Sequence, residues 1–90
     1  MYNFDRSDKL KKILSKLAKK DKNRYEATLK KINEVLNCED PNHYKNLCHD
    51  MKAFKRAHID SHFVLIFKVD DKNKVIKFED LQHHDVIYRR

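Results

Sequence analysis

The sequence contains no glycine, no tryptophan, one proline and two cysteines. The lack of glycine excludes a glycine-rich phosphate-binding loop. It also means that any backbone position with a positive φ must use another residue. Asparagine and aspartate tolerate that conformation best among the remaining residues, so Asn37 and Asn73 are the candidates.

Cysteine is too scarce for a disulfide framework, so Cys38 and Cys48 are expected to be free thiols. Zinc is an alternative role for these cysteines, because His43 and His49 lie within the same twelve residues. Their C-x4-H-x4-C-H spacing lacks the close C-x2-C pair that is typical of structural zinc sites. We therefore predict no metal and no cofactor.

Long hydrophobic runs are also missing. No stretch of about 18 apolar residues is present, so no membrane span is expected. The opening residues, MYNFDRSDKLKK, lack the apolar stretch of a signal peptide, and we expect a cytoplasmic protein. The 90 residues show no repeat or linker, which predicts a single domain over residues 1–90.

Positive charge is abundant, with a formal net charge of +7. Residues 1–31 hold eleven Lys/Arg and four Asp/Glu, whereas residues 32–90 hold ten of each. The surplus is therefore N-terminal, and such a surface attracts polyanions by releasing counterions. A solvated lysine-rich helix is the alternative. The candidate RNA-binding lysines in this region are Lys11, Lys12, Lys16 and Lys19.

Hydrophobic spacing predicts two helices in the first half of the chain. Ser7 can cap a helix whose apolar stripe is Leu10, Ile13, Leu14, Leu17 and Ala18. Asp21 can cap a second helix that ends near Asn37, with the stripe Tyr25, Leu29, Ile32, Val35 and Leu36. The short polar turn between them predicts an antiparallel helical hairpin, which needs another layer to cover its apolar face.

Strand patterns follow the proline. FVLIFKV (63–69) is typical of a central strand buried on both faces, and VIKFED (75–80) follows a turn at 70–73. KAFKRAHI (52–59) is a shorter strand candidate, and YNF (2–4) can add an edge strand. These elements predict an α+β fold of (β)ααβββ order. The helical hairpin packs on one face of a small antiparallel sheet of three to four strands, and a short C-terminal turn or helix leaves the sheet after Asp80.

The candidate chemistry comes from histidine, tyrosine, arginine and lysine, since no serine or thiol lies in a recognisable nucleophile motif. Strand alternation puts His58 on the same side as Arg56, and His62 opens the next strand. His84 and Tyr88 share a face if the tail is helical, and a tail that folds back brings them near the other two histidines. The residues chosen are His58, His62, His84 and Tyr88 for catalysis, and Lys55, Arg56, Arg89 and Arg90 for RNA binding.

This residue set suits phosphodiester transfer in RNA, where the 2′-hydroxyl of the substrate is the nucleophile. Imidazoles can remove one proton and donate another near neutral pH. Guanidinium and ammonium groups can hold the phosphate, and a phenol can stack on a base. Taken singly, each of these residues has an ordinary alternative as a surface histidine, a core tyrosine or a solubilising arginine.

Four segments of the C-terminal half resemble the RelE/ParE toxin superfamily, and especially its YafQ-like branch of messenger-RNA interferases. They are AFKRAHI (53–59), FVLIF (63–67), Lys77-Phe78-Glu79, and His84 followed four residues later by Tyr88. The resemblance implies a metal-independent toxin that cleaves messenger RNA on the ribosome and is inhibited by a cognate antitoxin. By position it assigns His58 and His84 to catalysis, with Tyr88 as the terminal aromatic.

The resemblance also marks departures. A further catalytic histidine of that branch falls near Lys45, with His49 nearby, and both are added as RNA-binding candidates. The aspartate that precedes the central strand in that branch is replaced by His62, and the arginine that many members carry in that strand is replaced by Val64. Two alternatives therefore stay open, a ParE-type gyrase inhibitor and a non-catalytic RNA- or partner-binding relative.

Overall fold

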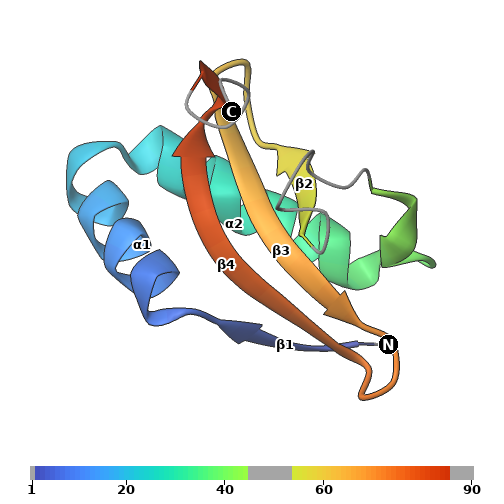
Figure 1. The fold of residues 1–90 in the computed structure, drawn as a ribbon. Helices are drawn as coiled ribbons and strands as arrows, with labels where there is room; N and C mark the ends of the chain where they lie inside the picture. The colour runs from blue at the N-terminus through green and yellow to red at the C-terminus, as the bar shows by residue number, and fades with distance from the viewer. Residues whose placement is uncertain (1, 45–53, 86–90) are drawn as a thin grey trace.

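Two helices and a four-stranded sheet make up the computed structural model, which describes residues 2–44 and 54–85 (Figure 1). This α+β order confirms the predicted (β)ααβββ fold. The elements are β1 (Asn3–Arg6), α1 (Asp8–Lys20), α2 (Lys22–Asn37), the short 3₁₀ helix η1 (Pro41–His43), β2 (Lys55–His58), β3 (Phe63–Asp70) and β4 (Val75–His83).

Both helices begin at the capping residues that the sequence predicts. The Ser7 hydroxyl accepts a hydrogen bond from the Leu10 N–H at 3.1 Å, and the Asp21 carboxylate accepts one from the Arg24 N–H at 3.1 Å. Asp21 also ends α1, because its own N–H donates to the Leu17 carbonyl at 2.8 Å. One residue therefore closes the first helix and opens the second, which produces the tight hairpin.

The sheet has the strand order β1-β4-β3-β2, and it is mixed rather than wholly antiparallel. β2, β3 and β4 form an antiparallel meander, whereas β1 runs parallel to β4. The parallel direction lets β1 deliver the chain to α1 beside the middle of β4. There the Ser7 N–H donates to the Phe78 carbonyl at 2.9 Å, and α1 packs against β4.

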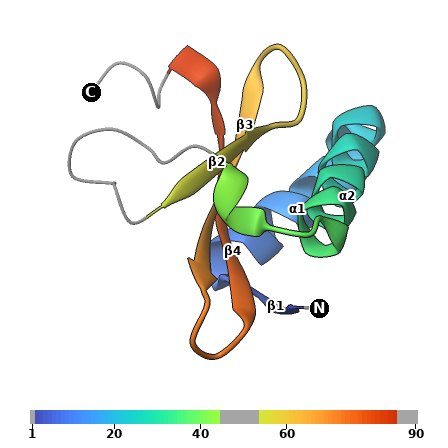
Figure 2. The same ribbon diagram turned by 90° about the vertical axis from the view of Figure 1, so that its right-hand side faces the viewer.

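The helical hairpin covers one face of the sheet (Figure 2). Alternate residues of β3 lie on its two faces: Leu65 and Phe67 belong to the core beneath the helices, and Val64 and Ile66 lie on the opposite face. All four are buried, which confirms the prediction of a strand buried on both faces. The core under the helices is formed by Leu10, Leu14, Ile32, Val35, Ala57, Leu65, Phe67, Ile76, Phe78 and Leu81.

Positive backbone φ occurs at Lys74, with φ 56°, and at neither predicted asparagine. Asn73 instead binds the Asp70 carboxylate, through its backbone N–H at 3.1 Å and its side-chain amide at 2.8 Å. The left-handed position of the hairpin turn therefore lies one residue further along than predicted. Asn37 is the last residue of α2, and Cys38 follows it in extended conformation, so this helix ends without a left-handed residue.

β4 is longer than predicted. It does not leave the sheet after Asp80, because Leu81 pairs with Leu65 in the core and His83 pairs with Phe63. Helical backbone begins only at His84 and Asp85, where the described chain ends. Within residues 2–44 and 54–85, neither helix has the length and apolar character needed to cross a bilayer.

Candidate active site

Four histidines come together at one end of the sheet. His58 is the last residue of β2, His62 directly precedes β3, and His83 ends β4, with His84 next to it. The antiparallel register explains the meeting, because it places the end of β2 and the end of β4 beside the start of β3 (Figure 1). Three of these residues were candidates from the sequence, and His83 was not.

The first histidine pair joins His58 and His84, whose ring centroids lie 5.7 Å apart at an interplanar angle of 41°. The His84 N–H donates to the His62 carbonyl at 2.6 Å, which ties the start of the tail to the turn before β3. The strand imidazole and the tail imidazole are therefore adjacent. Tyr88, the fourth candidate, lies outside the described residues.

The second pair joins His62 and His83, which stack with centroids 5.9 Å apart and an interplanar angle of 21°. Phe63 meets the His83 ring edge-on at 5.3 Å. His62 thus packs against a ring that was not predicted from the sequence. The two consecutive histidines, His83 and His84, were the signal in the sequence that could have indicated this contact. If the strand continues past Asp80, these two side chains point to opposite faces of the sheet, and each can meet a different histidine.

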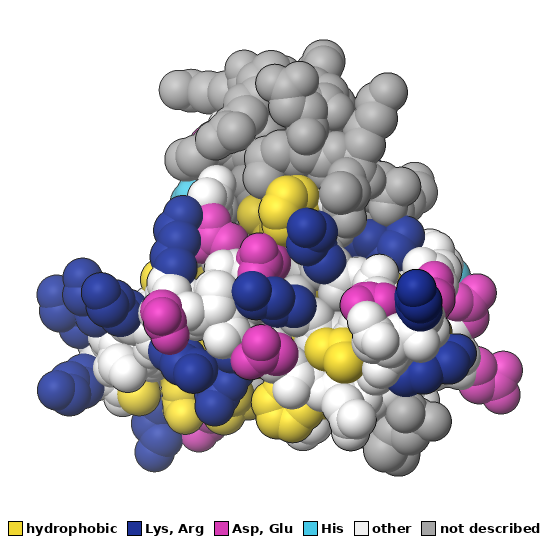
Figure 3. Space-filling model, turned by 60° about the horizontal axis from the view of Figure 1, so that its bottom comes forward, with side chains coloured by type: hydrophobic (Ala, Val, Ile, Leu, Met, Phe, Trp, Pro, Cys, Tyr) yellow, Lys and Arg dark blue, Asp and Glu magenta, His cyan; other side chains and the backbone are white. Residues whose placement is uncertain are grey.

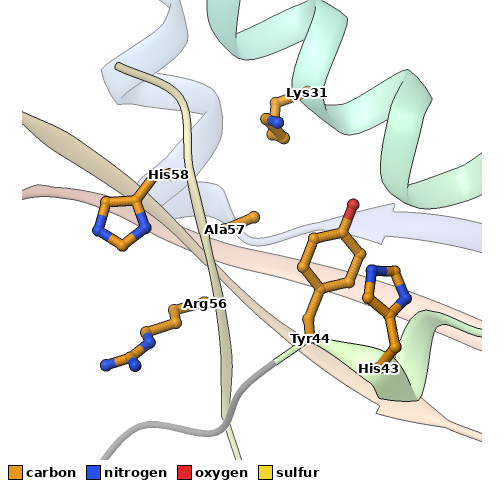
Figure 4. A pocket seen from close by; sticks show the side chains of 6 residues that line it. All are labelled: Lys31, His43, Tyr44, Arg56, Ala57 and His58. Atoms are coloured by element: carbon orange, nitrogen blue, oxygen red, sulfur yellow. The ribbon is translucent and has the colours of Figure 1, made fainter. Parts of the chain in front are cut away.

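A pocket of about 420 Å³ adjoins the edge strand β2 (Figure 4). Arg56 and His58 extend together to one side of β2, whereas Ala57 points to the other side, toward the helices. His58, one member of the His58–His84 pair, lines the 420 Å³ pocket, and Lys31 and Arg56 give the pocket positive charge. It is lined by Lys31, His43, Tyr44, Arg56, Ala57 and His58.

The His58 pKa is lowered from its ordinary value of 6.5. Partial burial of the ring is the largest cause, and the positive charges of His84, Arg56 and Lys31 act in the same direction. A lowered pKa keeps this imidazole neutral at pH 7, the form that can accept a proton.

We expect the His58 ring to titrate below pH 6.5 in an NMR titration of the folded protein. Arg56→Gln removes one nearby cation and should raise the midpoint, whereas Arg6→Gln in β1 should leave it unchanged. Since the folded pKa is depressed, protonation favours the unfolded chain, and the stability that His58 contributes is lost as pH falls through its folded pKa. A midpoint above 6.5 would contradict the expected effect of partial desolvation and of the nearby cations His84, Arg56 and Lys31.

The other candidate residues lie in three places. Lys55 alternates with Arg56 and turns to the other side of β2, where its ammonium donates to the Tyr44 carbonyl at 3.4 Å. The four α1 lysines are exposed. Figure 3 shows Lys and Arg side chains densest on the left, the side of the helical hairpin in Figure 1, with acidic groups among them. The candidates outside the described residues are Lys45, His49, Arg89 and Arg90.

Metal-ligating side chains do not cluster in the described part of the chain: no group of three His, Cys, Asp or Glu is placed to hold an ion there. Cys38 donates its S–H to the Val35 carbonyl at 3.0 Å, and burial raises the pKa of its thiol. Cys48 and His49, the other half of the zinc alternative, lie outside the described residues. The absence of a metal therefore stays a prediction.

Comparison with known sequences supplies the family, although no family model matches the chain. A protein of Methanocaldococcus jannaschii named "Putative toxin RelE4" is 49% identical over 90 residues, which cover 100% of this chain and 94% of that protein. The chain belongs to the RelE toxin family. It is therefore a toxin of a toxin–antitoxin system. A relative from Methanosarcina mazei, an uncharacterised protein, is 44% identical over 88 residues, which cover 98% of this chain and 100% of that protein.

Solved structures share the RelE fold at low sequence identity. YafQ from Escherichia coli matches with a TM-score of 0.68 and 23% identity, covering 98% of this chain and 99% of that one. A metal-bound toxin from Helicobacter pylori matches with a TM-score of 0.76 and 20% identity, covering 98% and 100%. The YoeB–YefM complex from Staphylococcus aureus matches with a TM-score of 0.73 and 15% identity, covering 93% and 98%. These likenesses support the fold alone.

Proposed function

We propose that this RelE-family toxin is an endoribonuclease that cuts messenger RNA on the ribosome by metal-independent acid–base catalysis. The observation that carries the proposal is the contact between the His58 and His84 rings, 5.7 Å between centroids, at the end of a sheet beside a cationic pocket. Two imidazoles at this separation can flank one phosphate and serve as its base and its acid.

In the proposed reaction His58 accepts the proton of the 2′-hydroxyl, because its lowered pKa keeps it neutral at pH 7. The 2′-oxygen then bonds to the adjacent phosphorus, and the bond from phosphorus to the 5′-oxygen breaks. Protonated His84 donates its proton to that leaving oxygen. The products are a 2′,3′-cyclic phosphate and a 5′-hydroxyl, so the atoms balance without water or metal.

Arg56 is the proposed phosphate contact. It lies two residues before His58 in β2 and extends to the same side of that strand. Many superfamily members supply a cation from the position of Val64, which pairs with His58 across the sheet and is fully buried in this chain. An arginine on the neighbouring strand and on the same face offers an equivalent charge to the extra negative charge of the transition state.

The exposed lysines of α1 are the proposed contact with ribosomal RNA. Replacing Lys11, Lys12, Lys16 and Lys19 by glutamine should weaken ribosome binding and reduce the slope of log affinity against log salt by up to ~3, if each lysine neutralises one phosphate. The matched control removes the same charge from exposed lysines of β3, β4 and their turn: Lys68, Lys72, Lys74 and Lys77. Equal losses in both quadruple variants, measured by sedimentation with ribosomes at several salt concentrations, would show that only net charge matters.

A cognate antitoxin is the proposed protein partner. The structural neighbour YoeB was solved as a complex with YefM. A segment that orders on binding can cover toxin surfaces that the thin core of a 90-residue chain leaves open. The partner should therefore suppress both RNA cleavage and growth arrest when the two proteins are produced together.

The activity is tested with purified protein that has been treated with EDTA and desalted, together with translating ribosomes and a defined messenger RNA. We expect cuts that follow the reading frame and disappear when ribosomes are omitted. A supercoiling assay with gyrase, run in parallel, should show no inhibition. Gyrase inhibition without cleavage would support the ParE-type alternative, and no effect in either assay would support a non-catalytic relative.

A further inference from the structure

His62 is exposed, yet several hydrogen bonds fix the position of its backbone. The Asp60 carboxylate accepts hydrogen bonds from the N–H groups of His62 and Phe63, both at 2.8 Å, and from the Arg24 guanidinium at 3.2 Å. Partial burial acts to raise the Asp60 pKa, but these donors outweigh it and lower the pKa. The carboxylate thus stays ionised and keeps the turn before β3 in one conformation.

The turn before β3 also lies at the end of a series of planar side chains, each of which packs against the next. The Arg24 guanidinium lies 4.1 Å from the centroid of the Phe63 ring, and Phe63 meets His83 edge-on at 5.3 Å. His83 in turn stacks on His62 at 5.9 Å. We define Arg24, Phe63, His83 and His62 as the stacking ladder. It joins α2, β3, β4 and the turn before β3, and its outermost member is the exposed His62.

The stacking ladder adjoins the proposed catalytic pair. His83 and His84 are neighbours in sequence, although β4 sends their side chains to opposite faces of the sheet. His62 is bound to His84 through its carbonyl, which accepts the His84 N–H at 2.6 Å. His62 is thus hydrogen-bonded at its backbone to the residue that carries the proposed acid, and its ring is exposed at the end of the sheet, where an RNA strand that crosses from one face to the other meets both histidine pairs.

A proton-carrier role for His62 fits this geometry less well than a stacking role. Among the described residues, the His62 ring stacks on His83, whereas the His58 ring lies beside His84. Imidazole and guanidinium planes are surfaces on which unpaired RNA bases stack. We propose that His62, supported by His83, is a stacking platform for an unpaired RNA base next to the scissile phosphate. This inference rests on the proposed ribonuclease function and names a base-binding subsite within it.

The test uses His62→Ala and His62→Phe, since phenylalanine keeps a flat face but cannot carry a proton. The probe is a short single-stranded 2′-fluoro RNA, which lacks the attacking hydroxyl, with 2-aminopurine at successive positions. Its fluorescence is measured after addition of the toxin, once with the RNA in solution and once with the RNA on programmed ribosomes. Binding of the wild type should quench the fluorescence at one position. His62→Phe should preserve the quenching, and His62→Ala should abolish it and weaken binding about 5- to 150-fold.

Phe4→Ala is the matched control, because Phe4 is an exposed aromatic residue, 53% accessible, in the edge strand β1 at the other side of the sheet. It should bind and quench like the wild type. Equal quenching by the wild type and His62→Ala, or no quenching in either setting, would overturn the platform. Quenching that depends on residue 62 without any cleavage of unmodified RNA would instead refute the nuclease and leave the base-binding site standing.

Discussion

His84→Ala should lower the rate of RNA cleavage by ~10²–10⁴-fold, the usual loss when one positioned proton carrier is removed. The His84 ring lies beside His58, with 5.7 Å between the ring centroids, which is the position of the proposed proton donor. A lysine or arginine nearby cannot take over this role, because neither side chain readily gives up its proton near neutral pH. His58→Ala should cause a loss of similar size. Because the two residues act as a unit, the double variant should be only slightly slower than either single variant.

The measurement is a single-turnover cleavage rate on programmed ribosomes, with ribosome binding measured separately. We expect binding to change little, because the exchange removes a group that acts mainly in the transition state. The unfolding free energy of His84→Ala should stay within ~0.5 kcal/mol of the wild type, as for most exchanges away from a core. Identical cleavage rates for the wild type and His84→Ala would contradict the assignment.

Phe67→Ala should destabilise the fold by ~3–5 kcal/mol, the typical cost of deleting a buried aromatic ring. Phe67 is fully buried, meets Phe78 at 5.8 Å and Tyr44 edge-on at 5.5 Å, and pairs with Lys55 of β2. For a chain of 90 residues the whole stability is only about 5–13 kcal/mol. This single change should therefore remove a large share of it.

Urea denaturation followed by circular dichroism measures this loss. Phe4→Ala removes the same side chain from an exposed position and should cost less than ~0.5 kcal/mol. A loss below ~1 kcal/mol for Phe67→Ala would mean that the region beneath the helices tolerates a large void. The core would then not be the close-packed layer that aligns β2 with β3.

Much of the fold follows from local patterns. The Ser7 and Asp21 caps, the two apolar helix stripes and the buried run of β3 are each encoded within a few neighbouring residues, and all are present in the structure. The parallel pairing of β1 with β4 joins residues about 70 positions apart, such as Asn3 and Val75. No local pattern specifies such a pairing, which explains why the sheet was expected to be antiparallel throughout.

The candidate site also has a part that the sequence indicates and a part that depends on long-range pairing. Residue chemistry and the family resemblance indicated His58 and His84, and the structure places their rings together. The role of His62 could not be inferred from the sequence, because it depends on how far β4 continues. Three more residues of pairing bring His83 opposite Phe63 and against His62. Strand ends depend on such long-range contacts and are the least predictable part of an element.

The chemistry of the cut RNA ends is the most direct test of a paired-histidine ribonuclease. Messenger RNA cut on ribosomes by the wild-type protein can be examined by mass spectrometry of the fragments. Transfer to the 2′-oxygen predicts a 2′,3′-cyclic phosphate, or the 3′-phosphate formed from it, beside a 5′-hydroxyl. A 3′-hydroxyl beside a 5′-phosphate would contradict catalysis by the His58–His84 pair.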